Sequence, residues 1–319
     1  MNGAPGFDPS RPASVLLAAA LAFFTTPPAP AAERAAARMA ESWVFFTRSV
    51  GSAGTLGGSF TAEAALVRTN ASVPGIPRIG FFRRPAEPGE YQRLAASIRS
   101  LGSPRGSGTH FPGAPLVSVG IMANGRAEVV HGQVTSALTP AEKEVFSSLE
   151  ATLEEVMKHP HKALEAAVEW VRGTIEPDDD LAILVRVSNP GLVPVRFLHP
   201  AGREEGGSGL GVVLSRVGPD GVALEAREVT FAASEVVEVG PDGKSVAGPY
   251  AGPIELAPGK DVRFRARSRV RLVPASYRAS ARVAVEAPPD SDEKAVSGTI
   301  AVELPALGVV RPGAKRGRE

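Results

Sequence analysis

The chain has 319 residues and a formal net charge of +1, so charge gives no general attraction to nucleic acid or anionic lipid. The sequence contains no cysteine, which excludes thiol catalysis, disulfides and thiolate metal sites. Its 34 glycines and 29 prolines are typical of strands joined by turns rather than of a helical bundle, and the length predicts two domains.

The N-terminus has the pattern of a signal peptide over residues 1–31. Ala13 to Phe24 is an apolar run too short to span a bilayer comfortably, and Ala29 to Ala31 offers the small residues that a signal peptidase reads. We therefore expect a periplasmic or extracellular protein whose mature chain has no membrane span. Met39 could instead start translation, in which case the protein would be cytoplasmic.

Two β-rich segments, residues 43–49 and 59–69, flank the glycine-rich stretch VGSAGTLGGSF. The stretch lacks the lysine of a phosphate-binding loop and the spacing of a dinucleotide-binding turn. We therefore predict a flexible connection between strands that could contact a partner. The candidate contact residues are Gly51, Ser52, Gly54, Thr55, Leu56 and Gly57.

Helical and hairpin signals follow in residues 76–157. Residues 76–84 favour an edge strand because Pro77 lacks a backbone donor. Apolar residues at spacings of three and four predict a helix from about residue 90 that Gly102 ends. Asn124-Gly125, between alternating apolar residues, predicts a hairpin over residues 115–132.

Thr139 is a favourable N-cap for a second helix, with Pro140 in its first turn and Glu142 completing a capping box. Helix formers over residues 161–173 predict a third helix. These elements together predict an α+β domain over residues 32–175, with an antiparallel sheet and three helices.

The second half changes to short strands separated by turn residues, without a helical stripe. We predict an all-β sandwich over residues 176–305, with the acidic segment 176–180 as the domain boundary. Residues 306–319 are expected to form a basic, disordered tail. Arginines alternate with apolar residues along one predicted strand and its extension: Arg263, Arg265, Arg267, Arg269 and Arg271.

The arginines allow two interpretations. They could bind an anionic polymer along one face of a sheet, or they could simply be solvated charges that keep the strand from aggregating. Because nearby segments supply acidic residues, the second interpretation is the simpler one.

Possible metal ligands are few. His159, His161 and Glu165 would lie near one another if residues 161–173 were helical, and segment 176–180 is rich in carboxylates. No HExxH motif, EF-hand spacing or G-x-S-x-G motif accompanies them. We therefore assign no catalytic, cofactor or metal residue and expect a protein that is not an enzyme.

The order of segments in the first half, WVFFTRSVGSAGTLGGSF, AEPGEYQRLAASIRSLG, PLVSVGIMANGRAEVVHG and LTPAEKEVFSSLEATLEEV, resembles the emfourin family of bacterial metallopeptidase inhibitors. The resemblance covers residues 43–157 and implies inhibition of a thermolysin-type peptidase. Residues 181–305 are similar to immunoglobulin-like modules of bacterial envelope proteins, in which a tyrosine such as Tyr277 often closes a corner.

These observations predict an exported, non-enzymatic, two-domain binding protein that acts by protein–protein contact, with peptidase inhibition as its specific form. The alternative is a structural or adaptor protein of the bacterial cell envelope. We expect a protein partner and no nucleic acid.

Overall fold

The computed structural model describes residues 42–49, 54–102, 116–123, 126–202, 207–246, 253–290 and 293–311. The expected signal peptide and the alternative start at Met39 lie outside these residues. The chain divides into two compact units, which are described separately. Unit 1 comprises Met1–Thr69 and Phe82–His159, and unit 2 comprises Asn70–Phe81 and Pro160–Glu319.

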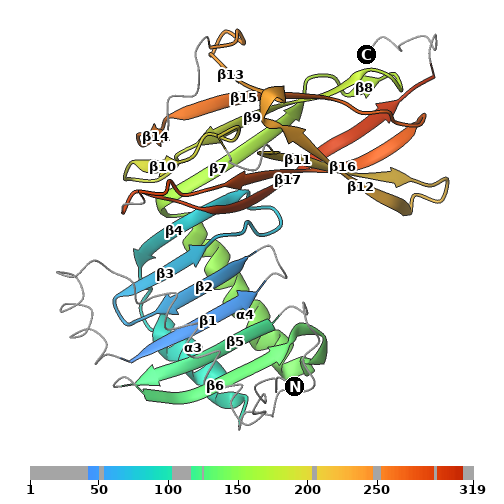
Figure 1. Ribbon diagram of the computed structural model, residues 1–319. Coiled ribbons are helices and arrows are strands. Elements are labelled where there is room, and N and C mark those ends of the chain that lie inside the picture. The colour runs from blue at the N-terminus through green and yellow to red at the C-terminus, as the bar shows by residue number, and fades with distance from the viewer. Residues whose placement is uncertain are drawn as a thin grey trace, which may run out of the picture. The chain divides into compact units, whose positions relative to one another are not determined.

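Unit 1 contains a β-sheet with two helices on one face (Figure 1). The strand order is β4-β3-β2-β1-β5-β6. The helices are α3, Glu90–Ser100, and α4, Pro140–Met157, and a short 3-10 turn η2 spans Thr135–Ala137. The strands are β1 Trp43–Ser49, β2 Thr55–Phe60, β3 Ala64–Thr69, β4 Arg78–Pro85, β5 Leu116–Ala123 and β6 Arg126–Val134.

Local sequence signals explain much of unit 1. The Thr139 hydroxyl accepts from the Glu142 backbone N–H, and the Glu142 carboxylate accepts from the Thr139 N–H, which confirms the capping box. Helix α3 ends before Gly102, whose φ is +74°, as the glycine signal predicts. Strands β5 and β6 pair antiparallel, so the hairpin is confirmed, although its turn residues 124–125 lie outside the described part.

Two predictions for the first strands are wrong. The single strand expected over residues 59–69 is a β2–β3 hairpin, because the Thr61 hydroxyl accepts from the backbone N–H groups of Glu63 and Ala64 and closes a turn there. Strand β4 is not an edge strand, since it pairs with β3 in unit 1 and its first residues neighbour β7 in unit 2. Pro77 precedes the strand, so its missing N–H removes no ladder bond.

Unit 2 contains two main sheets (Figure 1), which are antiparallel except where β8 pairs parallel with β17, and their buried apolar residues form one core. One sheet has the order β13-β15-β9-β7 with the start of β4, and the other has the order β12-β11-β16-β17-β8. A small sheet pairs β10 with β14, and a 3-10 turn η3 spans Ala233–Glu235. The strands are β7 Pro160–Trp170, β8 Thr174–Ile175, β9 Asp180–Ser188, β10 Val195–Phe197, β11 Gly207–Val217, β12 Ala223–Ala232, β13 Val236–Val239, β14 Ile254–Leu256, β15 Asp261–Arg269, β16 Ala275–Val285 and β17 Gly298–Val309.

The prediction of a third helix over residues 161–173 is wrong, because most of these residues form strand β7, which pairs antiparallel with β9. Every second residue from Leu164 to Trp170 packs against the core of unit 2. The expected tail is also wrong at its start, since residues 306–309 complete β17 and Pro305 accepts a hydrogen bond from the Trp170 indole at 2.8 Å. Residues 312–319 lie outside the described part.

The predicted fold class is therefore wrong. Strands dominate the described part of both units, which includes only two α-helices, and large antiparallel sheets replace an α+β domain followed by a separate immunoglobulin-like sandwich. Unit 2 also takes residues 70–81 and 160–175 from the stretch assigned to the first domain. No helix in the described ranges is long and apolar enough to cross a membrane.

Candidate functional site

The described part of the glycine-rich stretch, residues 54–60, is almost entirely strand β2, whereas the sequence predicted a flexible connection. Gly51 and Ser52 lie outside the described residues, Gly54 has a φ of +141°, and Thr55, Leu56 and Gly57 belong to β2. Leu56 is buried, as is Gly57. Of the candidate contact residues on β2, only Thr55 is therefore partly exposed.

The histidine–glutamate pair is not brought together as a helix would bring it. His161 and Glu165 lie four residues apart on β7, which separates their Cα atoms by about 13 Å in a strand. The His161 ring packs edge-on against Phe81, and Glu165 accepts a hydrogen bond from Arg78 at 3.0 Å. Within the described ranges, no group of three or more His, Asp and Glu side chains could hold a metal ion.

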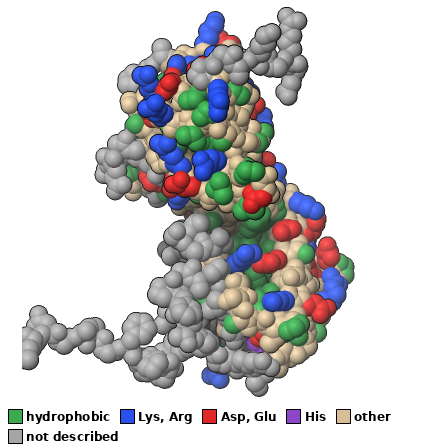
Figure 2. Space-filling model, turned by 90° about the vertical axis from the view of Figure 1, so that its right-hand side faces the viewer, with side chains coloured by type: hydrophobic (Ala, Val, Ile, Leu, Met, Phe, Trp, Pro, Cys, Tyr) green, Lys and Arg blue, Asp and Glu red, His purple; other side chains and the backbone are tan. Residues whose placement is uncertain are grey.

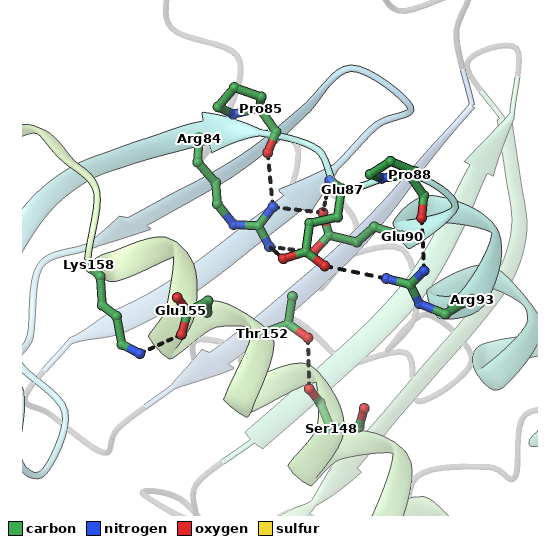
Figure 3. Close-up of polar contacts among 10 residues, drawn as sticks. All are labelled: Arg84, Pro85, Glu87, Pro88, Glu90, Arg93, Ser148, Thr152, Glu155 and Lys158. Carbon is green, nitrogen blue, oxygen red and sulfur yellow. Dashed lines mark hydrogen bonds and ion pairs between the residues drawn. The ribbon is translucent and has the colours of Figure 1, made fainter.

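A buried ion pair joins the end of β4 to the start of α3 (Figure 3). Arg84 donates to both carboxylate oxygens of Glu90, at 2.5 and 3.0 Å, and to the Pro85 carbonyl at 2.9 Å. The hydrogen bond from Arg84 to Glu90 raises the pKa of Arg84 above its ordinary value. Desolvation by burial lowers this pKa, and the nearby negative charges raise it further. Glu90 also accepts from the Glu87 backbone N–H. These contacts fix the turn before the helix, and we interpret the cluster as structural.

Two buried histidines have lowered pKa values. Burial lowers the pKa of His199, in unit 2, to about 4. Its Nδ1 accepts from the Ala201 backbone N–H at 3.1 Å, and its ring lies edge-on to Phe264. Burial also lowers the pKa of His131 on β6, although Glu142 and the Gly102 backbone oppose this shift. Both residues are almost fully buried, so we interpret both rings as part of the interior.

The outer face of the β7-β9-β15 sheet in unit 2 carries the arginines singled out in the sequence. Along β15, Val262, Phe264 and Ala266 are buried, whereas the arginines between them are partly or fully exposed. The predicted alternation is thus confirmed. Figure 2 shows Lys and Arg side chains (blue) recurring over the surface of unit 2, with Asp and Glu side chains (red) among them.

The strand register adds a further arginine to this face. Arg263 on β15 lies directly opposite Arg186 on β9, and Arg186 lies opposite Ala167 on β7. In the next row, Arg265, Leu184 and Glu169 occupy the corresponding positions. We call the outward-facing side chains of these three strands the arginine face. Its members are Glu165, Ala167, Glu169, Asp180, Ala182, Leu184, Arg186, Ser188, Asp261, Arg263, Arg265, Arg267 and Arg269.

Several arginines of this face have local partners, as the simpler sequence interpretation expects. Arg267 forms a hydrogen-bonded ion pair with Asp180, and Arg265 donates to the Ser245 hydroxyl at 3.2 Å. Arg271, just beyond β15, lies 3.9 Å from Asp178. The acidic segment 176–180 therefore supplies charges that balance part of the ladder, which is a different role from holding calcium.

Arg186 and Arg263 are less well balanced. The nearest acid to Arg263 is Asp261 on its own strand, at 3.9 Å. The side chain of Arg186 is exposed and forms no hydrogen bond or ion pair with any residue in the described ranges. Two guanidinium groups directly opposite each other destabilise a sheet unless something balances their charge.

Two depressions lie on or beside the arginine face. The first has a volume of about 320 Å³ and is lined by Ala167, Val168, Glu169, Leu184, Arg186 and Arg263. The second has a volume of about 420 Å³, and its charged lining residues are Arg172, Arg265, Arg267, Arg269 and the three aspartates of segment 176–180. Each lining therefore has one more arginine than carboxylates, but in the second Arg267 is hydrogen-bonded to Asp180, whereas in the first the two arginines lie opposite each other.

Sequence reasoning missed Arg186. The alternation in LAILVRVSN places it on the outward face of a strand, but the pairing that brings it opposite Arg263 joins segments far apart in the sequence. Glu169 was missed because its segment was predicted to be helical.

No protein-family model and no curated protein matches the chain. Among solved structures, it is similar to AvmM, which catalyses macrocyclization in alchivemycin A biosynthesis, at 12% identity over 48% of this chain and 92% of that one, with a TM-score of 0.26. It is also similar to the putative ApaA protein from Bordetella pertussis, at 12% identity over 47% of this chain and 94% of that one, with a TM-score of 0.21. A third similar structure is the CARDB domain of a Pyrococcus furiosus protein in complex with di-metal ions, at 12% identity over 46% of this chain and 94% of that one, with a TM-score of 0.19. Similarities at these TM-scores carry no argument about function.

Proposed function

We propose that this protein is a non-catalytic binding protein that contacts an acidic segment of a protein partner through the arginine face of unit 2. The observation that carries the proposal is the direct opposition of Arg186 and Arg263 on neighbouring strands beside an open depression. Two like charges directly opposite each other lower the stability of a sheet, and proteins keep such arrangements mainly at functional sites.

A protein partner fits this face better than a nucleic acid does. Acidic side chains lie among the arginines, including Glu165, Glu169 and Asp261, so the face offers no continuous basic track for a phosphate backbone, whereas the side chains of a flexible peptide can reach the arginines between them. The members of the arginine face, as defined above, also include no aromatic side chain on which bases could stack. A peptide with mixed charges can match both signs.

A defined probe tests the proposal. The full chain is titrated with a fluorescent oligoglutamate peptide at low and at high salt, with an oligolysine peptide of the same length for comparison. We expect saturable binding of the acidic peptide only, weakened by salt because exposed charges are screened. Replacing Arg186, Arg263, Arg265, Arg267 and Arg269 with Gln is expected to weaken binding at least tenfold.

A matched control uses arginines on the other sheet of unit 2. Arg278→Gln and Arg282→Gln alter the exposed arginines of β16 and should leave affinity within about twofold of the parent protein. No saturable binding by the parent protein, or an equal loss in this control, would overturn the proposal.

The resemblance of residues 43–157 to emfourins supplies a more specific candidate partner, a thermolysin-type metallopeptidase. This candidate rests on the sequence resemblance alone. It is tested by adding the full chain to a purified thermolysin-type peptidase and following hydrolysis of a peptide substrate. Replacement of residues 50–54 by a two-residue turn should abolish inhibition if the glycine connection is the contact, and no inhibition by the parent protein at micromolar concentration would refute the candidate.

A further inference from the structure

The first depression on the arginine face combines a pair of guanidinium groups with one separate carboxylate. We propose that Arg186 and Arg263 together hold one carboxylate of an extended partner segment, while Glu169 selects a basic residue two positions away from it. The inference rests on the proposed function and adds which partner sequence the face recognises.

The arginine pair has the geometry of a carboxylate site. Directly opposite residues on antiparallel strands have Cβ atoms about 5 Å apart, so the two guanidinium groups can approach the same ligand. Guanidinium groups bind carboxylates through paired N–H donors in a planar arrangement. The side chain of Arg263 is 35% exposed and Arg186 is exposed, so both are accessible to solvent.

The other arginines of the arginine face differ from this pair in their partners. Arg267 is hydrogen-bonded to Asp180 and Arg265 to Ser245, so these two arginines already have partners. Arg269 lies at the end of β15, directly opposite Asp180. Only in the row of Arg186 and Arg263 do two arginines face each other, and a bound carboxylate would relieve their repulsion.

Small and apolar side chains provide room for the ligand. Ala167 lies directly opposite Arg186, and its short side chain leaves the surface beside the guanidinium open. Leu184 and Val168 contribute apolar lining next to it. A peptide backbone or an aliphatic side chain could therefore lie over this part of the depression.

Glu169 fixes the second position. It lies on β7 opposite Leu184, which is two residues from Arg186 along β9, so Glu169 is about 7 Å from the arginine row along the strands and about 5 Å to the side of Arg186. An extended peptide has the same repeat, with residues i and i+2 on one side about 7 Å apart. A segment with an acidic residue at i and a basic residue at i+2, in either chain direction, therefore matches both charges.

The test compares three fluorescent peptides of equal length that carry one Glu-Ser-Lys, one Glu-Ser-Glu or one Gln-Ser-Lys motif in a neutral sequence. Binding to the full chain is measured by anisotropy. We expect the first peptide to bind at least tenfold more tightly than the other two. Arg186→Gln and Arg263→Gln should each reduce its affinity about tenfold, whereas the control Arg282→Gln should not change it.

Glu169→Gln distinguishes a loss of selectivity from misfolding, because misfolding would weaken the binding of every peptide. This variant should bind the Glu-Ser-Lys peptide more weakly and the Glu-Ser-Glu peptide several-fold more tightly, which narrows or reverses the preference. Equal losses in Arg186→Gln and Arg267→Gln would indicate diffuse attraction, which overturns this inference but leaves the proposed function standing. If neither these peptides nor oligoglutamate binds saturably, both proposals fail.

Discussion

Gly58 on β2 and Leu153 on α4 pack so closely that no side chain fits between them. A Cβ atom on Gly58 would lie 2.2 Å from Leu153 Cδ2, and Leu153 is fully buried. At this position, glycine therefore allows the helix to approach the sheet. This gives one glycine of the VGSAGTLGGSF stretch a packing role rather than a binding role.

Gly58→Ala should consequently destabilise unit 1 by about 1–3 kcal/mol, because the added methyl group overfills a packed interior. The free energy of unfolding is measured by urea titration with Trp43 as the fluorescent reporter, in a Trp170→Phe background.

Leu153→Ala supplies the matched test of this mechanism. The truncation itself should cost about 2–5 kcal/mol, but it removes the clash, so adding Gly58→Ala should then cost less than about 0.5 kcal/mol. Gly173→Ala lies in unit 2, where no atom lies within 4 Å of the new Cβ, and should leave the unfolding of unit 1 unchanged. If Gly58→Ala cost the same with and without Leu153, close packing could not be the reason for the glycine.

The Arg84–Glu90 pair leads to a second prediction. Glu90→Gln leaves a buried guanidinium without its carboxylate and should destabilise unit 1 by about 3–5 kcal/mol. Arg84→Met combined with Glu90→Leu removes both charges and should cost much less. Arg93→Ala changes an exposed arginine of the same cluster and should cost under about 0.5 kcal/mol. The same Trp43 titration measures all three, and a larger loss in the double variant than in Glu90→Gln would refute this account.

Signals contained in a few neighbouring residues could be predicted from the sequence. The limits of β1, the end of α3 at Gly102 and the capping box of Thr139 and Glu142 depend on local hydrogen bonds and backbone angles. They can therefore be predicted without knowing how the rest of the chain folds.

The failures involve contacts between distant segments. Residues 161–173 are rich in helix formers, yet strand pairing with β9 outweighs that preference. The alternation of Leu164, Ala166, Val168 and Trp170 was the signal that could have revealed the strand. The outward arginines of β15, which form half of the candidate site, could be predicted from the sequence. Their neighbour Arg186 could not, because its position depends on the register between β9 and β15, which periodicity does not reveal.

Export remains a prediction from the sequence, and it is tested on the mature N-terminus. Expression of the full sequence in a bacterial host, followed by mass spectrometry of the periplasmic and cytoplasmic fractions, should yield a chain cleaved near Ala31. Replacing Leu16 and Leu17 with Arg interrupts the apolar run and should retain the uncleaved protein in the cytoplasm. An intact Met1 in every fraction, or a chain that begins at Met39, would contradict the prediction.

The stability of unit 2 should fall with acid because of His199. Its folded pKa of about 4 lies below the value of about 6.5 expected in the unfolded chain, so unfolding takes up a proton below pH 6.5. The contribution of neutral His199 is fully present above pH 6.5 and is lost as the pH falls to about 4, amounting to about 3 kcal/mol. His199→Asn keeps an acceptor for the Ala201 N–H but cannot titrate in this range. Urea unfolding followed through Trp170, in a Trp43→Phe background, should show the parent protein losing its advantage over this variant between pH 7 and 4.5. Parallel stability curves for the two proteins would show that His199 does not carry this pH dependence.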